Sequence, residues 1–336
     1  MRVRKQIIGA ALAAALGCAG AASAQQATPD QLAIAAGPQG SINYAISAGM
    51  AALATNHVGI NTIAVAYAGT ALALPLVQQG DPLIGVNTGP SVYQGFAGVG
   101  EFDRKHPALR LLSAGSSNNL AIAVKETSPI KTGADLRGKR VPAQWPAIPA
   151  CHAHTTAMLA NLGLSWDDVK PVPVTNVPTA ARALADDRVD AHLCASPAIA
   201  ALREVNATSP LRFISIDPAP EAMARARKVY QYNEKATLLK KGAMGWLPSD
   251  TWTLDYPWTL YANASLPDDI AYRFVKAVWE HNDELVKVHP IFRQWTQESM
   301  LNPEVGVPYH PGAVRFFKEK GVWTPAAEAA QKMPAR

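Results

Sequence analysis

Short apolar runs alternate with amphipathic stretches along the chain from residue 31 onward. The first run, residues 32–36, predicts a strand, and the apolar residues after it recur at helical spacing from Ile42 to Leu53. The same order of a strand followed by a helix occurs twice more, with strands expected at 62–66 and 83–86 and helices at 71–79 and 90–96. This alternation is typical of βα units around a mainly parallel sheet.

The second half of the chain continues this pattern after an interruption. Residues 109–125 hold two apolar runs separated by the polar segment 115–119, which we interpret as a crossing between two lobes. Beyond it, strands are expected at 141, 172–174, 189–194 and 211–216, and helices near 158–163 and 180–184. The run 211–216 would return the chain to the first lobe. Apolar spacing over 270–288 predicts one long amphipathic helix.

The N-terminus has the features of an export signal. Arg2, Arg4 and Lys5 precede an apolar stretch that ends in the small-x-small pattern Ala22-Ser23-Ala24. We therefore predict a signal peptide over residues 1–24, cleaved after Ala24, and a periplasmic protein. A lipoprotein acylated at Cys18 is the less favoured alternative, because the residues before Cys18 lack the usual leucine.

Length and charge narrow the class of protein further. A chain of 336 residues exceeds what one core usually fills, so we expect two lobes: lobe I from 25–116 plus 217–336, and lobe II from 117–216. The sequence has 31 basic and 26 acidic residues, and three of the basic ones lie in the expected signal. The remainder is close to neutral and has no basic stretch interleaved with aromatic residues, which argues against nucleic acid as a partner.

Several segments in order resemble one family. They include Leu32-Ala33-Ile34-Ala35-Ala36-Gly37 with Gly40-Ser41, the Gly69-Thr70 turn, Asp135-Leu136-Arg137-Gly138-Lys139-Arg140-Val141, Leu159-Ala160-Asn161-Leu162-Gly163-Leu164, residues 183–191, and Leu266-Pro267-Asp268-Asp269. Over residues 31–288 the chain resembles the TAXI receptors, the TRAP-associated extracytoplasmic immunogenic proteins that serve tripartite ATP-independent periplasmic (TRAP) transporters.

This resemblance implies a fold and a function. The expected fold is α/β, of the periplasmic-binding-protein type II, with two Rossmann-like lobes joined by two hinge crossings. The expected function is a monomeric solute-binding receptor, without enzymatic activity or cofactor. It would capture a small organic acid or amino acid between its lobes and deliver it to an ion-gradient-driven TRAP permease in the membrane.

The ligand is expected where strands run into helices. In open α/β sheets this edge forms the binding crevice, where glycines let the backbone approach a ligand and helix N-termini attract anions. In lobe I the candidate residues are Gly40, Ser41, Asn43, Tyr44, Gly69, Thr70, Asn87 and Ser91. The serines, threonine and glycines have an alternative role as helix caps and turns.

The second lobe departs from the family. Its relatives usually have a Gly-Ser-Gly-Thr-like loop, but this chain has Pro146-Ala147-Ile148-Pro149-Ala150-Cys151-His152 there. The candidate ligand contacts are Gln144, Trp145, Ala150, Cys151 and His152, with Trp246 as an apolar lid where relatives tend to have Tyr. Arg182, Lys125, Arg137 and Lys139 are expected at the surface.

Cys151 and Cys194 are the only cysteines after the expected signal. The resemblance places both in lobe II loops that face the cleft, so in an oxidising compartment we expect a disulfide between them. Two alternatives are a metal site of Cys151, His154, His192 and Cys194, and an enzyme with Cys151 as nucleophile and His152 or His154 as base. Neither is favoured, because the spacing matches no known zinc finger and no other catalytic motif accompanies the cysteines.

Overall fold

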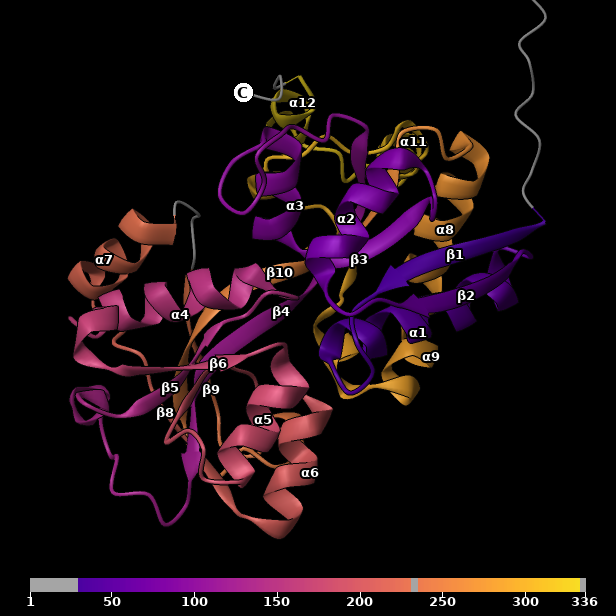
Figure 1. Cartoon of the computed structure of the whole chain (residues 1–336). Coiled ribbons are helices and arrows are strands. Elements are labelled where there is room, and N and C mark those ends of the chain that lie inside the picture. The colour runs from indigo at the N-terminus through magenta and orange to yellow at the C-terminus, as the bar shows by residue number, and fades with distance from the viewer. Residues whose placement is uncertain (1–29, 231–234, 333–336) are drawn as a thin grey trace, which may run out of the picture.

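The computed structural model describes residues 30–230 and 235–332, and the expected signal peptide lies outside them. The chain has an α/β fold with two lobes that lie side by side (Figure 1). Two long strands, β4 (Leu109–Lys125) and β10 (Thr251–Asn263), run from one lobe into the other. Each lobe has its own apolar core.

Lobe I is built from the predicted βα units. Parallel pairing joins β1 to β2 and β3, and β10 adds an antiparallel strand beside β3. The units are β1 (Gln31–Ala36), α1 (Ile42–His57), β2 (Asn61–Ala66), α2 (Thr70–Gln79), β3 (Ile84–Thr88) and α3 (Gly89–Ala97). Because β1 to β3 run parallel, their carboxyl ends meet at one edge, and α1, α2 and α3 begin there.

The C-terminal part of the chain completes lobe I. It consists of α8 (Asp268–Glu280), α9 (Asn282–Val288), α10 (Gln297–Met300), α11 (Pro311–Glu319), α12 (Pro325–Gln331) and the 3-10 helices Pro290–Gln294 and Pro303–Val305. The single helix expected over 270–288 was wrong, because His281 leaves the helical conformation with φ −123° and ψ 30°. The apolar spacing continues through the break, so periodicity alone does not reveal it.

Lobe II contains the remaining elements. They are β5 (Arg140–Gln144), α4 (Pro149–Asn161), β6 (Lys170–Val174), α5 (Val177–Ala185), β7 (His192–Ala195), α6 (Ala200–Thr208), β8 (Leu211–Ile214), α7 (Pro220–Tyr230), β9 (Lys235–Leu239) and the 3-10 helices Gly133–Leu136, Trp166–Asp168 and Ala243–Gly245. Strands β5 and β6 form a separate parallel pair, whereas β7 and β8 pair with β4 and β9 pairs with β10.

The hinge is a ladder of two paired strands. Strand β4 is continuous through the polar residues 115–119, the segment that the sequence predicts as a crossing between the lobes. It pairs with β10 in lobe I, where Leu109 faces Asn263, and in lobe II, where Leu120 faces Leu254. The buried amides of Asn118 and Asn119 bond to the Tyr256 hydroxyl (2.9 Å) and the Thr253 hydroxyl (3.3 Å). These bonds let polar side chains remain in a buried strand.

The expected lobe boundary at residue 217 was also wrong. Strand β8 pairs with the lobe II end of β4, where Ile214 faces Ile122, so it does not return the chain to lobe I. The core of lobe II then includes Met223, Tyr230 and Leu239. The second crossing is therefore β10, and residues 217–230 and 235–250 belong to lobe II.

Among the described residues, none of the helices combines the length and the apolar character needed to cross a bilayer.

Candidate functional site

A small cavity lies between the two lobes, against the hinge. Its volume is about 60 Å³, enough for only a few water molecules. It is lined from lobe I by Gly37, Pro38, Ser41, Ile42, Asn43, Asn87 and Thr88, from the hinge by Asn118, Leu120, Tyr256 and Trp258, and from lobe II by Ile148, Ala150, Cys151, His154, Val177, Cys194 and Ile199. The structure thus brings together residues that are far apart in the sequence at the strand-to-helix edge.

Helix N-termini converge on this cavity. Helices α1, α3, α4, α5 and α6 all have a residue of their first turn, or the residue just before it, in the lining. The unpaired N–H groups and the dipole at a helix start favour negative charge. None of the lining residues in the described part of the chain is Lys, Arg, Asp or Glu. Any attraction for an anion therefore comes from backbone N–H groups and uncharged polar side chains, not from a charged side chain of the lining.

Three of the predicted lobe I residues shape the cavity wall. The Ser41 hydroxyl accepts a hydrogen bond from the Tyr44 N–H (3.2 Å) and caps α1. Asn43 accepts from the Gly37 N–H (2.6 Å) and donates to the Val86 carbonyl (2.7 Å), so its amide holds the loop after β1 to the end of β3. The side-chain Oδ1 of Asn87 accepts from the Thr88 N–H (2.8 Å).

The other lobe I candidates do not line the cavity. Tyr44 is half-buried on α1, and Ser91 is buried within α3, 3.2 Å from the Thr88 hydroxyl. Thr70 is the first residue of α2, and its side chain lies outside the described part. Gly40 and Gly69 instead lie where the lobes touch.

The lobes are in direct contact at these two glycines. A Cβ atom on Gly69 would lie 1.6 Å from the carbonyl oxygen of Ala147 in lobe II. At Gly40 the carbonyl accepts a hydrogen bond from the N–H of Ala201 at the start of α6 (3.4 Å). The described conformation is therefore closed.

Only part of the predicted lobe II site lines the cavity. Ala150 and Cys151 do, because they begin α4. Gln144 and Trp145 have left-handed backbone, with φ of 69° and 53°, which turns Gln144 out to solvent and Trp145 into the core of lobe II. His152 points outward and stacks on Trp166, with the ring centroids 4.8 Å apart.

Trp246 does not cover the cavity. Its indole N–H donates to the Pro197 carbonyl (2.6 Å), and its ring packs against Phe213 of lobe II. The cavity is instead bounded by the hinge aromatics Tyr256 and Trp258. The sequence alone does not show whether an aromatic residue packs within a lobe or lines the cavity.

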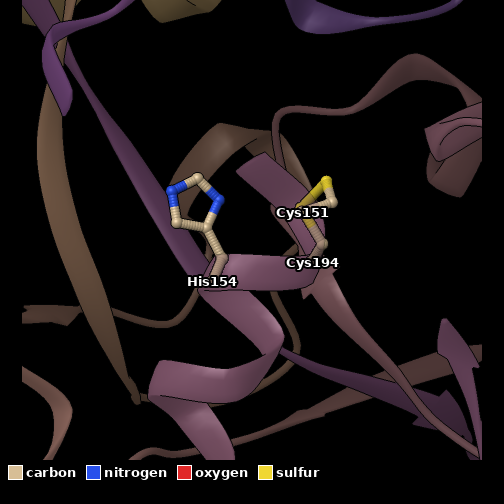
Figure 2. Close-up of side chains that lie close together, drawn as sticks. All are labelled: Cys151, His154 and Cys194. Carbon is tan, nitrogen blue, oxygen red and sulfur yellow. A yellow bond between two sulfur atoms is a disulfide. The ribbon is translucent and has the colours of Figure 1, made fainter. Parts of the chain in front are cut away.

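The two cysteines form a disulfide that is part of the cavity wall. It joins Cys151 at the start of α4 to Cys194 at the end of β7, with the Cα atoms 5.5 Å apart. Figure 2 shows His154, one turn along α4 from Cys151, beside this disulfide. The bond fixes the first turn of α4 to the neighbouring strand.

His154 is a neutral group in a buried polar chain. Its Nε2 lies 2.6 Å from the Tyr230 hydroxyl and its Nδ1 lies 3.0 Å from the Tyr256 hydroxyl, to which Asn118 also donates. Burial lowers the pKa of His154 to about 3. The imidazole is therefore uncharged at neutral pH and presents no cation to a ligand.

The side-chain positions test the two alternative roles of the cysteines, as metal ligands or as a catalytic nucleophile. The sulfur and imidazole nitrogen atoms of Cys151, Cys194 and His154 lie within 4.8 Å of one another, but His192 is not part of this cluster and packs against Trp145. With the sulfurs bonded to each other, Cys151 offers neither a thiolate ligand to a metal ion nor a nucleophile.

A carboxylate from lobe I reaches the start of α4. Glu101, in the loop after α3, hydrogen-bonds to the backbone of Ala150 and to the Ser91 side chain. Its Oε2 atom is shielded from solvent and has no hydrogen-bond partner. Burial is the main cause that raises its pKa to about 7, and the two hydrogen bonds oppose this shift. Glu101 therefore links the two lobes at a helix start that would otherwise favour an external anion.

We expect Glu101→Gln to stabilise the closed protein at pH 8 and to have a much smaller effect at pH 5. A carboxyl whose pKa is raised from 4.5 to about 7 costs stability that builds up as pH rises through this window, by up to about 3 kcal/mol. The amide keeps an acceptor oxygen without the charge. Thermal unfolding at both pH values measures the effect, with the exposed Asp103→Asn as a control for the loss of one charge. A variant that melts like the parent at pH 8 would contradict the prediction.

The cavity-lining residues that the sequence did not predict lie mainly on the hinge. Asn118, Leu120, Tyr256 and Trp258 line the cavity because β4 and β10 pair there, and nothing in the sequence reveals that pairing. Glu101 was missed because it lies in a loop outside the strand-to-helix corners.

The fold and the interlobe cavity define the periplasmic-binding-protein type II class. Residues 34–321 match the model of the NMT1-like family. The chain belongs to the NMT1-like family, because the match covers most of its length.

Solved structures resemble the chain in fold at low sequence identity. A protein described as a periplasmic transporter has 13% identity and a TM-score of 0.55, covering 91% of this chain and 96% of its own. The R. palustris protein Rpa4515, solved with adipate, has 15% identity and a TM-score of 0.54, covering 89% and 97%. The periplasmic aliphatic sulphonate-binding protein SsuA of Escherichia coli has 16% identity and a TM-score of 0.44, covering 91% and 93%.

Proposed function

We propose that this protein is a periplasmic solute-binding receptor that closes its two lobes over a small organic acid or amino acid. The observation that carries the proposal is the cavity between the lobes. Five helices begin at this cavity, and none of the described residues that line it has a charged side chain. Such a site suits a carboxylate or another small anion held by backbone N–H groups. Membership of the NMT1-like family and the type II fold support this interpretation.

The ligand needs more room than the closed cavity has. A volume of about 60 Å³ is well below that of ordinary ligand sites, so the ligand must enter an open form before the lobes close, and the cavity lining must make room for it. The apolar part of the lining, from Ile42, Leu120 and Trp258, suits an acid with a hydrocarbon portion. Adipate is a suitable first probe, because a protein of the same fold was solved with it.

The partner of the receptor is proposed from the resemblance to TAXI receptors. A TRAP permease in the membrane would recognise the closed surface formed by the two lobes and accept the solute. The export signal predicted over residues 1–24 and the disulfide between Cys151 and Cys194 both suit an oxidising periplasm. We propose that the receptor acts as a monomer, without cofactor or catalysis.

A ligand screen combined with solution scattering tests this proposal. We expect one or more organic acids or amino acids to raise the melting temperature, since a ligand that binds the folded state stabilises it. The same ligand should reduce the radius of gyration, because it favours the closed state. A ligand that binds with no compaction, or a full screen with no stabilising compound, would contradict the proposal.

A further inference from the structure

A second cluster of potential metal ligands lies on lobe I, outside the interlobe cavity. It consists of His57 at the end of α1, His281 at the junction of α8 and α9, and Glu284 in the first turn of α9. The nitrogen and oxygen atoms that these side chains offer all lie within 4.8 Å of one another. Three elements of the fold thus place two imidazoles and a carboxylate at one point.

Both imidazoles face the same carboxylate oxygen. The Nε2 of His57 lies 3.0 Å from Glu284 Oε1, and the Nδ1 of His281 lies 3.6 Å from that atom. The two rings are stacked, with centroids 3.6 Å apart and planes at 12°. Two nitrogen donors and one oxygen donor are the ligand types that borderline divalent ions prefer. Because imidazole lone pairs lie in the ring plane, one of the stacked rings must turn before both nitrogens point at one ion.

The cluster is held by the core beneath it and remains open to solvent. Leu285, next to Glu284, is buried, and Gly49 of α1 allows close packing, since a Cβ there would lie 3.5 Å from Leu285 and 2.9 Å from Phe292. The side chains of His57, His281 and Glu284 are 24%, 36% and 39% exposed. An ion can therefore reach the cluster, and a rigid support reduces the cost of ordering it.

We propose that His57, His281 and Glu284 form a binding site for a borderline divalent metal ion, with Zn²⁺ as the representative. The two imidazoles and the carboxylate supply three ligands, which leaves further coordination to water. The ion would connect the end of α1 to the junction of α8 and α9 and stabilise lobe I. A hard ion such as Mg²⁺ prefers all-oxygen sites and should not compete.

Titration of the tag-free, chelator-treated protein with Zn²⁺ by calorimetry tests the proposal. We expect one Zn²⁺ per molecule, a raised melting temperature, and neither effect with Mg²⁺. His57→Gln, His281→Gln and Glu284→Gln should each weaken Zn²⁺ binding about tenfold or more, since losing a ligand costs at least as much as losing a supporting group. Circular dichroism checks that each variant is folded.

Two variants serve as matched controls. Asp283, the neighbour of Glu284, is exposed and pairs with Lys287 at 3.3 Å, and Asp283→Asn removes its charge. His152→Gln removes an exposed imidazole of lobe II. Both should bind Zn²⁺ like the parent. The proposal is overturned if the parent does not bind Zn²⁺, if the folded variants of the three ligands bind it unchanged, or if His152→Gln abolishes binding.

Discussion

Gly69→Ala is expected to lower the affinity for the ligand by about 100-fold or more, equivalent to about 2.8 kcal/mol, while the protein stays folded. The added Cβ would lie 1.6 Å from the Ala147 carbonyl oxygen of lobe II, a distance that no adjustment of a flexible side chain relieves. The backbone of Gly69 is extended, with φ −173°, so alanine adopts it without strain. The substitution therefore blocks closure and leaves lobe I intact.

Calorimetry with a ligand from the screen measures this loss, and solution scattering adds a second readout. The Gly69→Ala protein should keep the larger radius of gyration of the open form when ligand is added. Leu72→Ala, an exposed position on the same helix, is the matched control and should bind and compact like the parent. Full closure of Gly69→Ala with ligand would show that the lobes do not meet as described.

Replacing both cysteines, as Cys151→Ala with Cys194→Ala, is expected to cost about 4 kcal/mol of the free energy of unfolding. The disulfide closes a loop with a sequence separation of 43 residues, and the loss of that constraint on the unfolded chain gives this magnitude. For a protein of this size the melting temperature should fall by about 6 °C. Ligand affinity should also fall, because the start of α4 in the cavity wall is no longer tied to β7.

Differential scanning calorimetry with and without a thiol reductant measures the first effect. Reductant should lower the melting temperature of the parent towards that of the double variant and leave the double variant unchanged. If the double variant melted at the same temperature as the oxidised parent, the disulfide would contribute nothing to stability. If the double variant bound the ligand at parental affinity, the disulfide would stabilise lobe II without determining the shape of the cavity.

Much of the architecture could be predicted because local patterns dictate it. In lobe I, each apolar run at β1, β2 and β3 is followed by an amphipathic stretch, and the structure has the expected strands and helices. The type II fold class was confirmed. The hinge could not be predicted in the same way. The polar run 115–119 looks like a loop, and only the buried partners Tyr256 and Thr253 explain why it is a strand.

The same limit applies to the candidate site. Glycines and helix caps such as Gly69 and Ser41 can be located from the chain, because turn and cap chemistry is local. The directions of Trp145 and Trp246 depend on left-handed backbone and on distant carbonyl groups, which the sequence does not display. The contact between Glu101 and Ala150 arises only when two separate lobes meet.

The paired strands of the hinge restrict how the molecule opens. Since β4 and β10 are hydrogen-bonded to each other on both sides of the crossing, the lobes cannot slide independently, and opening must bend both strands together. The weakest place in this pairing is at Pro257, opposite Ser117, because proline has no N–H to donate and the register shifts just beyond it. Motion between the lobes should therefore concentrate on one short axis through these two residues, so that a single local flexure governs access to the whole cavity.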